Sequence, residues 1–525
     1  MVKKAVTDEP TASVEELSGH SLLRGGIWVI ASRALPQVYV LVSSVLIARF
    51  LTVGDMGRQS YISFVSASLV MVCSFGLSGA LVRYGGELVG QDRLAVLRGL
   101  IWWSTKIQIF GAVLTAVIMV LIGAFSHNME ASWMWAAVAT AFATFQNVPN
   151  GVLSVLRRWR EASIITLVIG LAFTVGIAGI LALGGGVAGV FAVGAVLSIV
   201  ATAWTSWIAL KVLDSVAPRS EPYDELKRPM IGYSATIWAG FLLTLVVLRR
   251  SEFFFLDRYS SANAIAYYSV AFAVVSGVGS AVESLSGVIA PTVASLHGSG
   301  DSVRISSGFS RASRLVVLVC VPISAFGIVF GPPLIRLVYG DNYARTAGPL
   351  RIMLLAFPII ALMSLCSGLL WGVGHVKAWL LVFCFAAVVD VALDMLLIPG
   401  HAEVGAAWAN NTAQVVASVM IVTYTIRKFG PLEWKGFVLA RAVVASALAA
   451  ATGWFCVSLV AGADGILAGA VVSTILFLAL SRLLRTVPED DARWIGDSVH
   501  GKFGKTIAGI VGLAASDRSD ELIGS

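Results

Sequence analysis

Apolar stretches of about 20 to 27 residues recur along the chain from residue 24 to residue 484, and short polar segments separate them. Each stretch is long enough to cross the roughly 30 Å hydrocarbon core of a bilayer as a helix. We therefore expect an all-α polytopic membrane protein with about fourteen transmembrane helices. The predicted spans are residues 24–48, 60–82, 100–124, 133–155, 162–184, 187–210, 230–256, 264–289, 312–335, 347–371, 378–398, 403–426, 437–461 and 464–484.

Composition supports the membrane interpretation. Hydrophobic residues make up 58% of the chain, charged residues only 13%, and the mean hydropathy is +0.86. A water-soluble domain of this length needs more charge on its surface. The five cysteines form no C-x-x-C pair, and no Walker, Rossmann or zinc motif is present. We expect no catalytic residues, no cofactor and no resident metal ion.

Basic residues predict the orientation. Most Lys and Arg residues fall in the loops that are cytoplasmic if the N-terminus is cytoplasmic, for example Arg157 and Arg158 after the fourth span. Both termini are then cytoplasmic in the inner (plasma) membrane. Because the topology accounts for the net charge of +7, no nucleic-acid partner is expected.

A weak internal repeat divides the chain. At an offset of 208, Leu77-Ser78-Gly79 matches Leu285-Ser286-Gly287. Such parallel repeats predict two pseudo-symmetric lobes of six helices with a central cavity between them. The expected organisation is a cytoplasmic tail (1–21), an N-lobe (22–210), a linker (211–229), a C-lobe (230–428), two further helices (429–485) and a cytoplasmic tail (486–525) that is either amphipathic or disordered.

Two segments resemble a known family. The stretch from Phe330 to Trp379, FGPPLIRLVYGDNYARTAGPLRIMLLAFPIIALMSLCSGLLWGVGHVKAW, and the segment from Ile398 to Asn411, IPGHAEVGAAWANN, resemble the polysaccharide (oligosaccharidyl-lipid) flippases. That family belongs to the exporter superfamily that also holds the lipid II flippases and the multidrug and toxin extruders. The resemblance implies two six-helix bundles around a cavity that opens to either side in turn, followed by two extra helices.

Charged residues inside predicted spans are the candidate site residues, because lipid tolerates them poorly. Arg33 lies nine residues after Arg24, about 13 Å along a helix and close to the middle of the membrane. Its guanidinium group suits a diphosphate, and lipid II flippases are similar in using arginines of the first helix. A structural ion pair is the alternative.

Arg249, Arg250 and Glu252 stand in the outer half of the seventh predicted span. They resemble a basic-then-acidic element of the flippase family at this helix, and we expect them to line the mouth of the cavity. The alternative is a helix that ends at Leu248 with solvated charges beyond it.

Acidic residues of the second half are candidates for charge balance or ion coupling. Asp390 and Asp394 share one face of the eleventh span and suit proton or sodium coupling, or pairing with arginine. Glu283 stands alone in the eighth span. The first six spans contain no Asp or Glu, which disfavours a cationic drug as substrate. The amides of Gln146, Asn147 and Asn150 suit either interhelical hydrogen bonds or sugar contacts.

These observations predict a flippase that moves a polyprenyl-diphosphate-linked oligosaccharide across the inner membrane by alternating access, for cell-surface polysaccharide synthesis. Arg33, Arg249 and Arg250 would bind the diphosphate. The expected partners are the lipid-linked glycan, the bilayer, and a polysaccharide polymerase or assembly protein. The alternatives are a cation-coupled multidrug or metabolite extruder on the same fold, and a non-transporting scaffold of a glycan-assembly complex.

Overall fold

The computed structural model describes residues 36–125, 131–216, 224–248, 251–298, 302–430, 437–460, 462–484 and 486. Throughout this part of the chain the regular structure is helical, and no strand occurs in it. The chain divides into two compact units. Helices α12 and α15 contribute to both of them.

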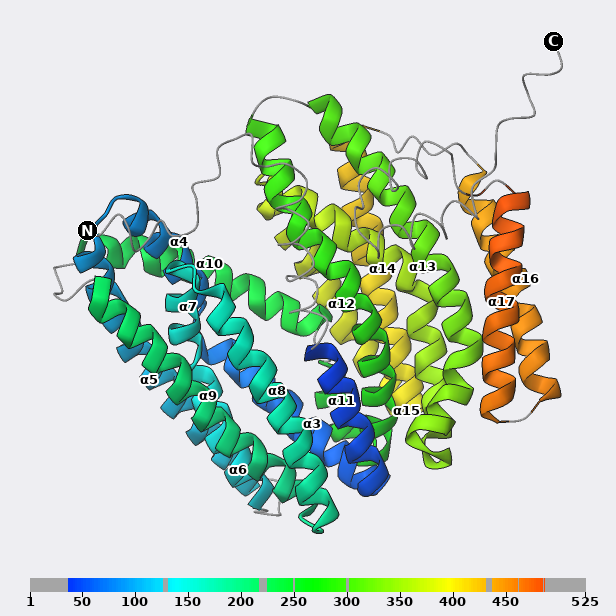
Figure 1. Cartoon of the computed structure of the whole chain (residues 1–525), viewed down its shortest axis with the longest axis horizontal. Helices are drawn as coiled ribbons and strands as arrows, with labels where there is room; N and C mark the ends of the chain where they lie inside the picture. Colours follow the sequence, from blue (N-terminus) through cyan, green and yellow to red (C-terminus); the bar gives the residue numbers. More distant parts are fainter. Residues whose placement is uncertain are drawn as a thin grey trace. The chain divides into compact units, whose positions relative to one another are not determined.

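The first unit contains residues 36–269 and Asp390–Glu403. Its helices α5, α6, α8 and α9 run side by side (Figure 1). The elements are the helix Pro36–Phe50, α3 (Val53–Cys73), α4 (Leu77–Gly90), α5 (Leu94–Phe125), α6 (Ala131–Phe145), α7 (Asn147–Val155), α8 (Trp159–Ala182), α9 (Gly186–Val216), α10 (Asp224–Leu248), α11 (Glu252–Tyr259) and the start of α12 (Ala262–Gly298).

The second unit contains Val270–Val389 and the described residues that follow position 403. Its contacts join α13 to α14 and α16, and α16 to α17. The elements are the rest of α12, α13 (Ser302–Tyr339), the short 3-10 helix η1 (Asp341–Thr346), α14 (Ala347–Gly372), both ends of α15 (Val376–Phe429), α16 (Val438–Leu459) and α17 (Ala463–Leu483).

Lipid-facing surface is visible on single helices. On α5 the side chains of Phe110, Val113, Val117 and Leu121 are all exposed. Their spacing of three and four residues places them along one face of the helix. An exposed apolar stripe of this length suits acyl chains rather than water. The protein is thus a multi-pass membrane protein.

The predicted spans overlap described helices, the first of them in part. Three spans predicted as single helices, 60–82, 133–155 and 230–256, are each divided between two helices. By length and apolar composition ten described helices could cross a membrane, or eleven if the bent pair α3 and α4 is one span. Helix α15 covers two predicted spans, 378–398 and 403–426. The backbone of Ala402, three residues after Pro399, is not helical and separates the two. The total of fourteen spans stays a prediction, as do the domain boundaries.

The break between α3 and α4 shows how the fold satisfies backbone groups inside the membrane. Phe75 and Gly76 adopt left-handed backbone angles, and the two helices meet at 41°. Such a break frees carbonyl groups that water cannot reach in lipid. Side chains replace the missing donors: Trp238 Nε1 donates to the Val72 carbonyl (2.7 Å) and Gln108 Nε2 donates to the Cys73 carbonyl (3.2 Å).

A second break changes the expected geometry of the seventh span. Residues 230–256 were predicted to form one helix, but α10 ends at Leu248 and α11 begins at Glu252. The alternative was a helix that ends at Leu248 with solvated charges beyond it. Its helix end agrees with α10, but Glu252 is fully buried rather than solvated. The charged residues Arg249, Arg250 and Glu252 interrupt the apolar pattern at this point, and the pattern resumes at Phe253.

Candidate functional site

The predicted site residues divide into two groups. Arg33, Arg249 and Arg250 lie outside the described residues, and so does the side chain of Glu283, whose backbone belongs to α12. Their roles stay predictions. Glu252, Asp390 and Asp394 are described, and all three are fully buried.

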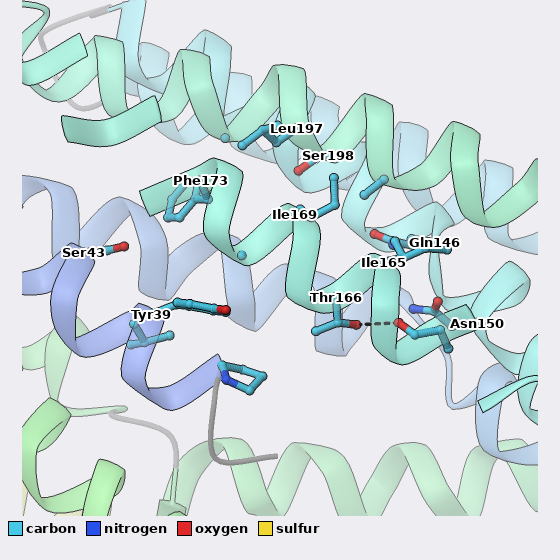
Figure 2. A pocket seen from close by; sticks show the side chains of 16 residues that line it. Tyr39, Ser43, Gln146, Asn150, Ile165, Thr166, Ile169, Phe173, Leu197 and Ser198 are labelled. Carbon is cyan, nitrogen blue, oxygen red and sulfur yellow. Dashed lines mark hydrogen bonds between the residues drawn. The ribbon is translucent and has the colours of Figure 1, made fainter. Parts of the chain in front are cut away.

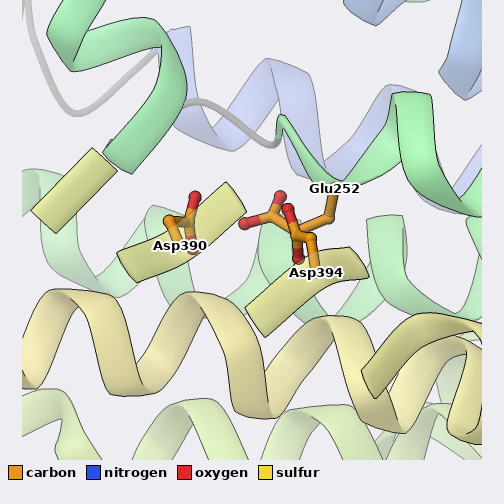
Figure 3. A group of neighbouring side chains, drawn as sticks. All are labelled: Glu252, Asp390 and Asp394. Carbon is orange, nitrogen blue, oxygen red and sulfur yellow. The ribbon is translucent and has the colours of Figure 1, made fainter. Parts of the chain in front are cut away.

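The three described carboxylates come together in the first unit. Each contributes an oxygen, and these oxygens all lie within 4.8 Å of one another. Figure 3 shows Asp390 and Asp394 reaching from α15 toward Glu252 on the facing helix. The structure therefore joins two candidates that the sequence had suggested separately, the acid of the seventh span and the acids of the eleventh.

Local structure explains why these acids meet. Asp390 and Asp394 are four residues apart on α15, so their side chains leave the same helical face. Glu252 is the first residue of α11, directly after the break that follows α10. The N-terminus of a helix carries partial positive charge and favours an acidic side chain. The break thus turns Glu252 toward α15 and gives its carboxylate a favourable local field.

Hydrogen bonds from described residues to the two buried aspartates are few. The Ser251 hydroxyl lies 3.1 Å from Asp390 Oδ2 and 2.7 Å from the Val246 carbonyl oxygen, and its one proton can serve only one of them fully. Neither carboxylate oxygen of Asp394 accepts a hydrogen bond from any described residue. The phenol of Tyr268 is close enough to interact electrostatically with all three acids.

Electrostatics restrict the charge state of this cluster. Two unit charges 4.8 Å apart repel each other by about 3.5 kcal/mol at an effective dielectric constant near 20. Three buried carboxylates would repel in three pairs and would also lose their hydration. Protons, a bound cation or a nearby arginine would each relieve this repulsion. Carboxylate oxygens at this spacing can surround one hard cation at metal–oxygen distances of about 2.4 Å.

Aromatic rings cover the cluster and connect it to α3. Phe253, next to Glu252, packs edge-to-face against Phe64 of α3 and against Tyr268 of α12. Phe64 also contacts Phe254. Because these rings are in contact, a movement of Glu252 would also displace side chains of α3, a helix of the N-terminal half.

Sequence reasoning missed Ser251 and Tyr268 as neighbours of the acids. A serine at a helix break and a tyrosine in an apolar span carry no pattern of their own. The signal that could have found them is the charge on Glu252, because a buried acid needs polar neighbours. Only the fold identifies which residues these are.

Comparison with sequence families gives one extensive match. The family described as "Polysaccharide biosynthesis protein" matches residues 46–347, which is more than half of the chain. Among curated proteins no sequence matches this chain significantly.

Solved structures with the same fold are membrane transporters. The lipid II flippase MurJ in an inward closed conformation has a TM-score of 0.68 and 15% identity, covering 87% of this chain and 98% of its own. An inward-facing multidrug resistance MATE family transporter of the MOP superfamily has a TM-score of 0.64 and 14% identity, covering 77% and 98%. A MOP superfamily transporter from Pyrococcus furiosus has a TM-score of 0.55 and 15% identity, covering 78% and 96%. At these identities the likeness shows the fold alone.

Proposed function

Since this chain belongs to the family of polysaccharide biosynthesis proteins, we propose that it is a flippase for a polyprenyl-diphosphate-linked oligosaccharide. It would move this lipid from the cytoplasmic to the outer leaflet of the inner membrane. The family match supports a glycan-related role, and the shared fold with MurJ and MATE transporters supports transport. Transport of this kind involves no covalent chemistry and needs no cofactor.

The diphosphate would bind to arginine. Arg33, Arg249 and Arg250 are the candidates, because the sequence places them deep in the first and seventh predicted spans, and a guanidinium group can bind phosphate oxygens in a bidentate manner. Arg249 and Arg250 precede Glu252 by three and two positions, so two positive charges are followed by a negative one along this segment. Both termini would be cytoplasmic, and a polysaccharide polymerase would receive the product.

The carboxylate cluster carries the coupling part of the proposal. Glu252, Asp390 and Asp394 are fully buried with oxygens within 4.8 Å of one another, so a cation or protons would stabilise them. We assign sodium or protons as the driving species. Binding would neutralise the acids, and release on the other side of the membrane would restore repulsion and favour a different arrangement of α11 and α15.

Export in a cell that depends on this protein tests the proposal. Depletion should cause one polyprenyl-linked oligosaccharide to accumulate, which mass spectrometry of lipid extracts identifies, while surface polysaccharide disappears. Glu252→Gln and Asp394→Asn should each lower export at least tenfold at normal protein level. Glu87→Gln is the matched control, because Glu87 is an exposed acid in α4 that pairs with Arg83.

Two other outcomes would contradict the proposal. If no lipid-linked glycan accumulates and a cationic drug does, the chain is a drug extruder. If the glycan reaches the surface normally in Glu252→Gln and Asp394→Asn cells but not in depleted cells, the chain supports assembly as a scaffold. Arg33→Ala tests the diphosphate contact separately, because normal export by that variant removes Arg33 from the site.

A further inference from the structure

A cavity lies in the first compact unit, and none of its lining residues belongs to the carboxylate cluster. Its volume is about 490 Å³, within the range of small-molecule sites. The helix Pro36–Phe50, α7, α8 and α9 contribute to its wall, together with Gln146 at the start of α7 (Figure 2).

The lining is polar but carries no permanent charge. None of the described lining residues is Asp, Glu, Lys, Arg or His. Hydroxyl and amide groups alternate there with apolar side chains. The polar side chains are those of Tyr39, Ser43, Gln146, Asn150, Thr166 and Ser198.

Several of these groups are available to a ligand. No hydrogen bond joins the side-chain amide of Asn150 to another described residue, and Figure 2 shows it beside Thr166 at the edge of the pocket. Thr166 donates its proton to the Ala162 carbonyl (3.0 Å), so its oxygen can still accept. Gln146 makes only a long contact of 3.5 Å to Thr205. The amides supply both donors and acceptors, and Thr166 adds an acceptor.

Two aromatic rings add flat apolar surface. Tyr39 extends from the helix Pro36–Phe50 into the pocket, and Phe173 lines it from α8 (Figure 2). Gly170 leaves room for the Tyr39 ring because it has no side chain. A Cβ atom at this position would lie only 2.7 Å from Tyr39 Cδ2. The face of an aromatic ring is partly negative and attracts the polarised C–H groups of a sugar ring.

We propose that this cavity binds one uncharged sugar residue of the transported glycan; this inference rests on the proposed flippase function. Hydroxyls of a neutral sugar match the amides and hydroxyls, and its C–H face matches the rings. A uronate or a cationic drug would enter a cavity without a counter-charge, at a desolvation cost. By sequence, Arg33 stands three positions before Pro36, which lines the cavity.

Saturation-transfer NMR on the purified full chain tests sugar binding. The probes are methyl α-glucoside, methyl β-galactoside and methyl N-acetyl-β-glucosaminide, with methyl β-glucuronide as the charged comparison. At least one neutral probe should bind and the glucuronide should not. Asn150→Leu and Thr166→Val should each weaken the binding about fivefold, the effect of one hydrogen bond of roughly 1 kcal/mol. Gly170→Ala should weaken it as well, by displacing the Tyr39 ring.

Thr236→Val is the matched control for Thr166→Val. Thr236 is an exposed threonine of α10 whose hydroxyl also donates to the carbonyl four residues earlier, and it does not line the cavity. Circular dichroism and gel filtration confirm that each variant folds. The inference is overturned if no neutral probe binds, if the glucuronide binds equally well, or if the pocket variants bind like Thr236→Val. Such a failure leaves the export phenotypes of Glu252→Gln and Asp394→Asn unchanged, so it is distinguishable from a failure of the flippase proposal.

Discussion

At the scale of single residues, the surroundings of Asp394 predict that a bound cation stabilises the protein. Both of its oxygens are buried without a hydrogen bond from a described residue, and Glu252 and Asp390 surround them. Any cation that binds the folded cluster alone stabilises the protein, by about 2.7 kcal/mol at a hundred times its dissociation constant. We expect the melting temperature of purified protein to be several degrees higher in sodium chloride than in choline chloride of equal ionic strength.

Asp394→Asn should abolish this sodium effect, because it removes one of the three negative charges that attract the ion. Glu87→Gln should keep it, since Glu87 is exposed and forms a surface ion pair of small energetic value. If the melting temperature does not depend on sodium but changes with pH, the coupling ion is the proton. If the melting temperature depends on neither sodium nor pH, a coupling role for the cluster is contradicted.

The same residues show how far sequence reasoning reaches into the site. Glu252, Asp390 and Asp394 could be identified because a charge inside an apolar span is unusual. That they meet could not be predicted, since it depends on a helix break before Glu252 and on the packing of two distant spans. Tyr39 and Thr166 had no signal, because neutral polar residues in membrane helices commonly serve packing.

At the scale of helices, the close contact of α3 with α12 predicts that a larger residue at this contact destabilises the protein. A Cβ atom at Gly57 would overlap the backbone carbonyl oxygen of Ala262, which has little freedom to move. Gly57→Ala should therefore force the helices apart and destabilise this arrangement by about 1–3 kcal/mol, a usual cost of overpacking. The measurement is the melting temperature of the purified variant, together with export in cells.

Gly86→Ala on α4 provides the matched control. A Cβ atom there has nothing within 4 Å, so the substitution should be neutral or slightly stabilising. Equal melting temperatures for the two variants would show that α3 and α12 do not pack this closely.

Helix positions were predictable and helix breaks were not. A run of apolar residues identifies a span, because its length must match the membrane. The breaks at Phe75–Gly76 and at Ala402 involve positive φ angles at two residues, Phe75 and Ala402, that rarely adopt them. Gly76 is one of 51 glycines and has no distinguishing pattern. The break at Phe75–Gly76 has tertiary partners, Trp238 and Gln108, which sequence position does not reveal.

At the scale of the whole molecule, the sequence predicted the fold class and its resemblance to polysaccharide flippases, and the family match and the shared transporter fold confirm both. Alternating access is the part of the proposed function that involves the whole molecule. It requires helices of the N-terminal and C-terminal halves to separate during the cycle. Ser60 of α3 donates to Ser269 of α12 across 3.0 Å, so this pair marks such a contact.

A disulfide at this contact should stop transport if the two helices separate in each cycle. Ser60→Cys with Ser269→Cys, in a background without the five native cysteines, places two sulfur atoms close enough to bond. Oxidation should abolish export and reduction should restore it. Thr115→Cys with Thr144→Cys is the matched pair, because these hydroxyls lie 3.4 Å apart between α5 and α6, which we expect to move together. If the Ser60–Ser269 cross-link leaves export intact, α3 and α12 stay together throughout the cycle, and substrate must pass without their separation.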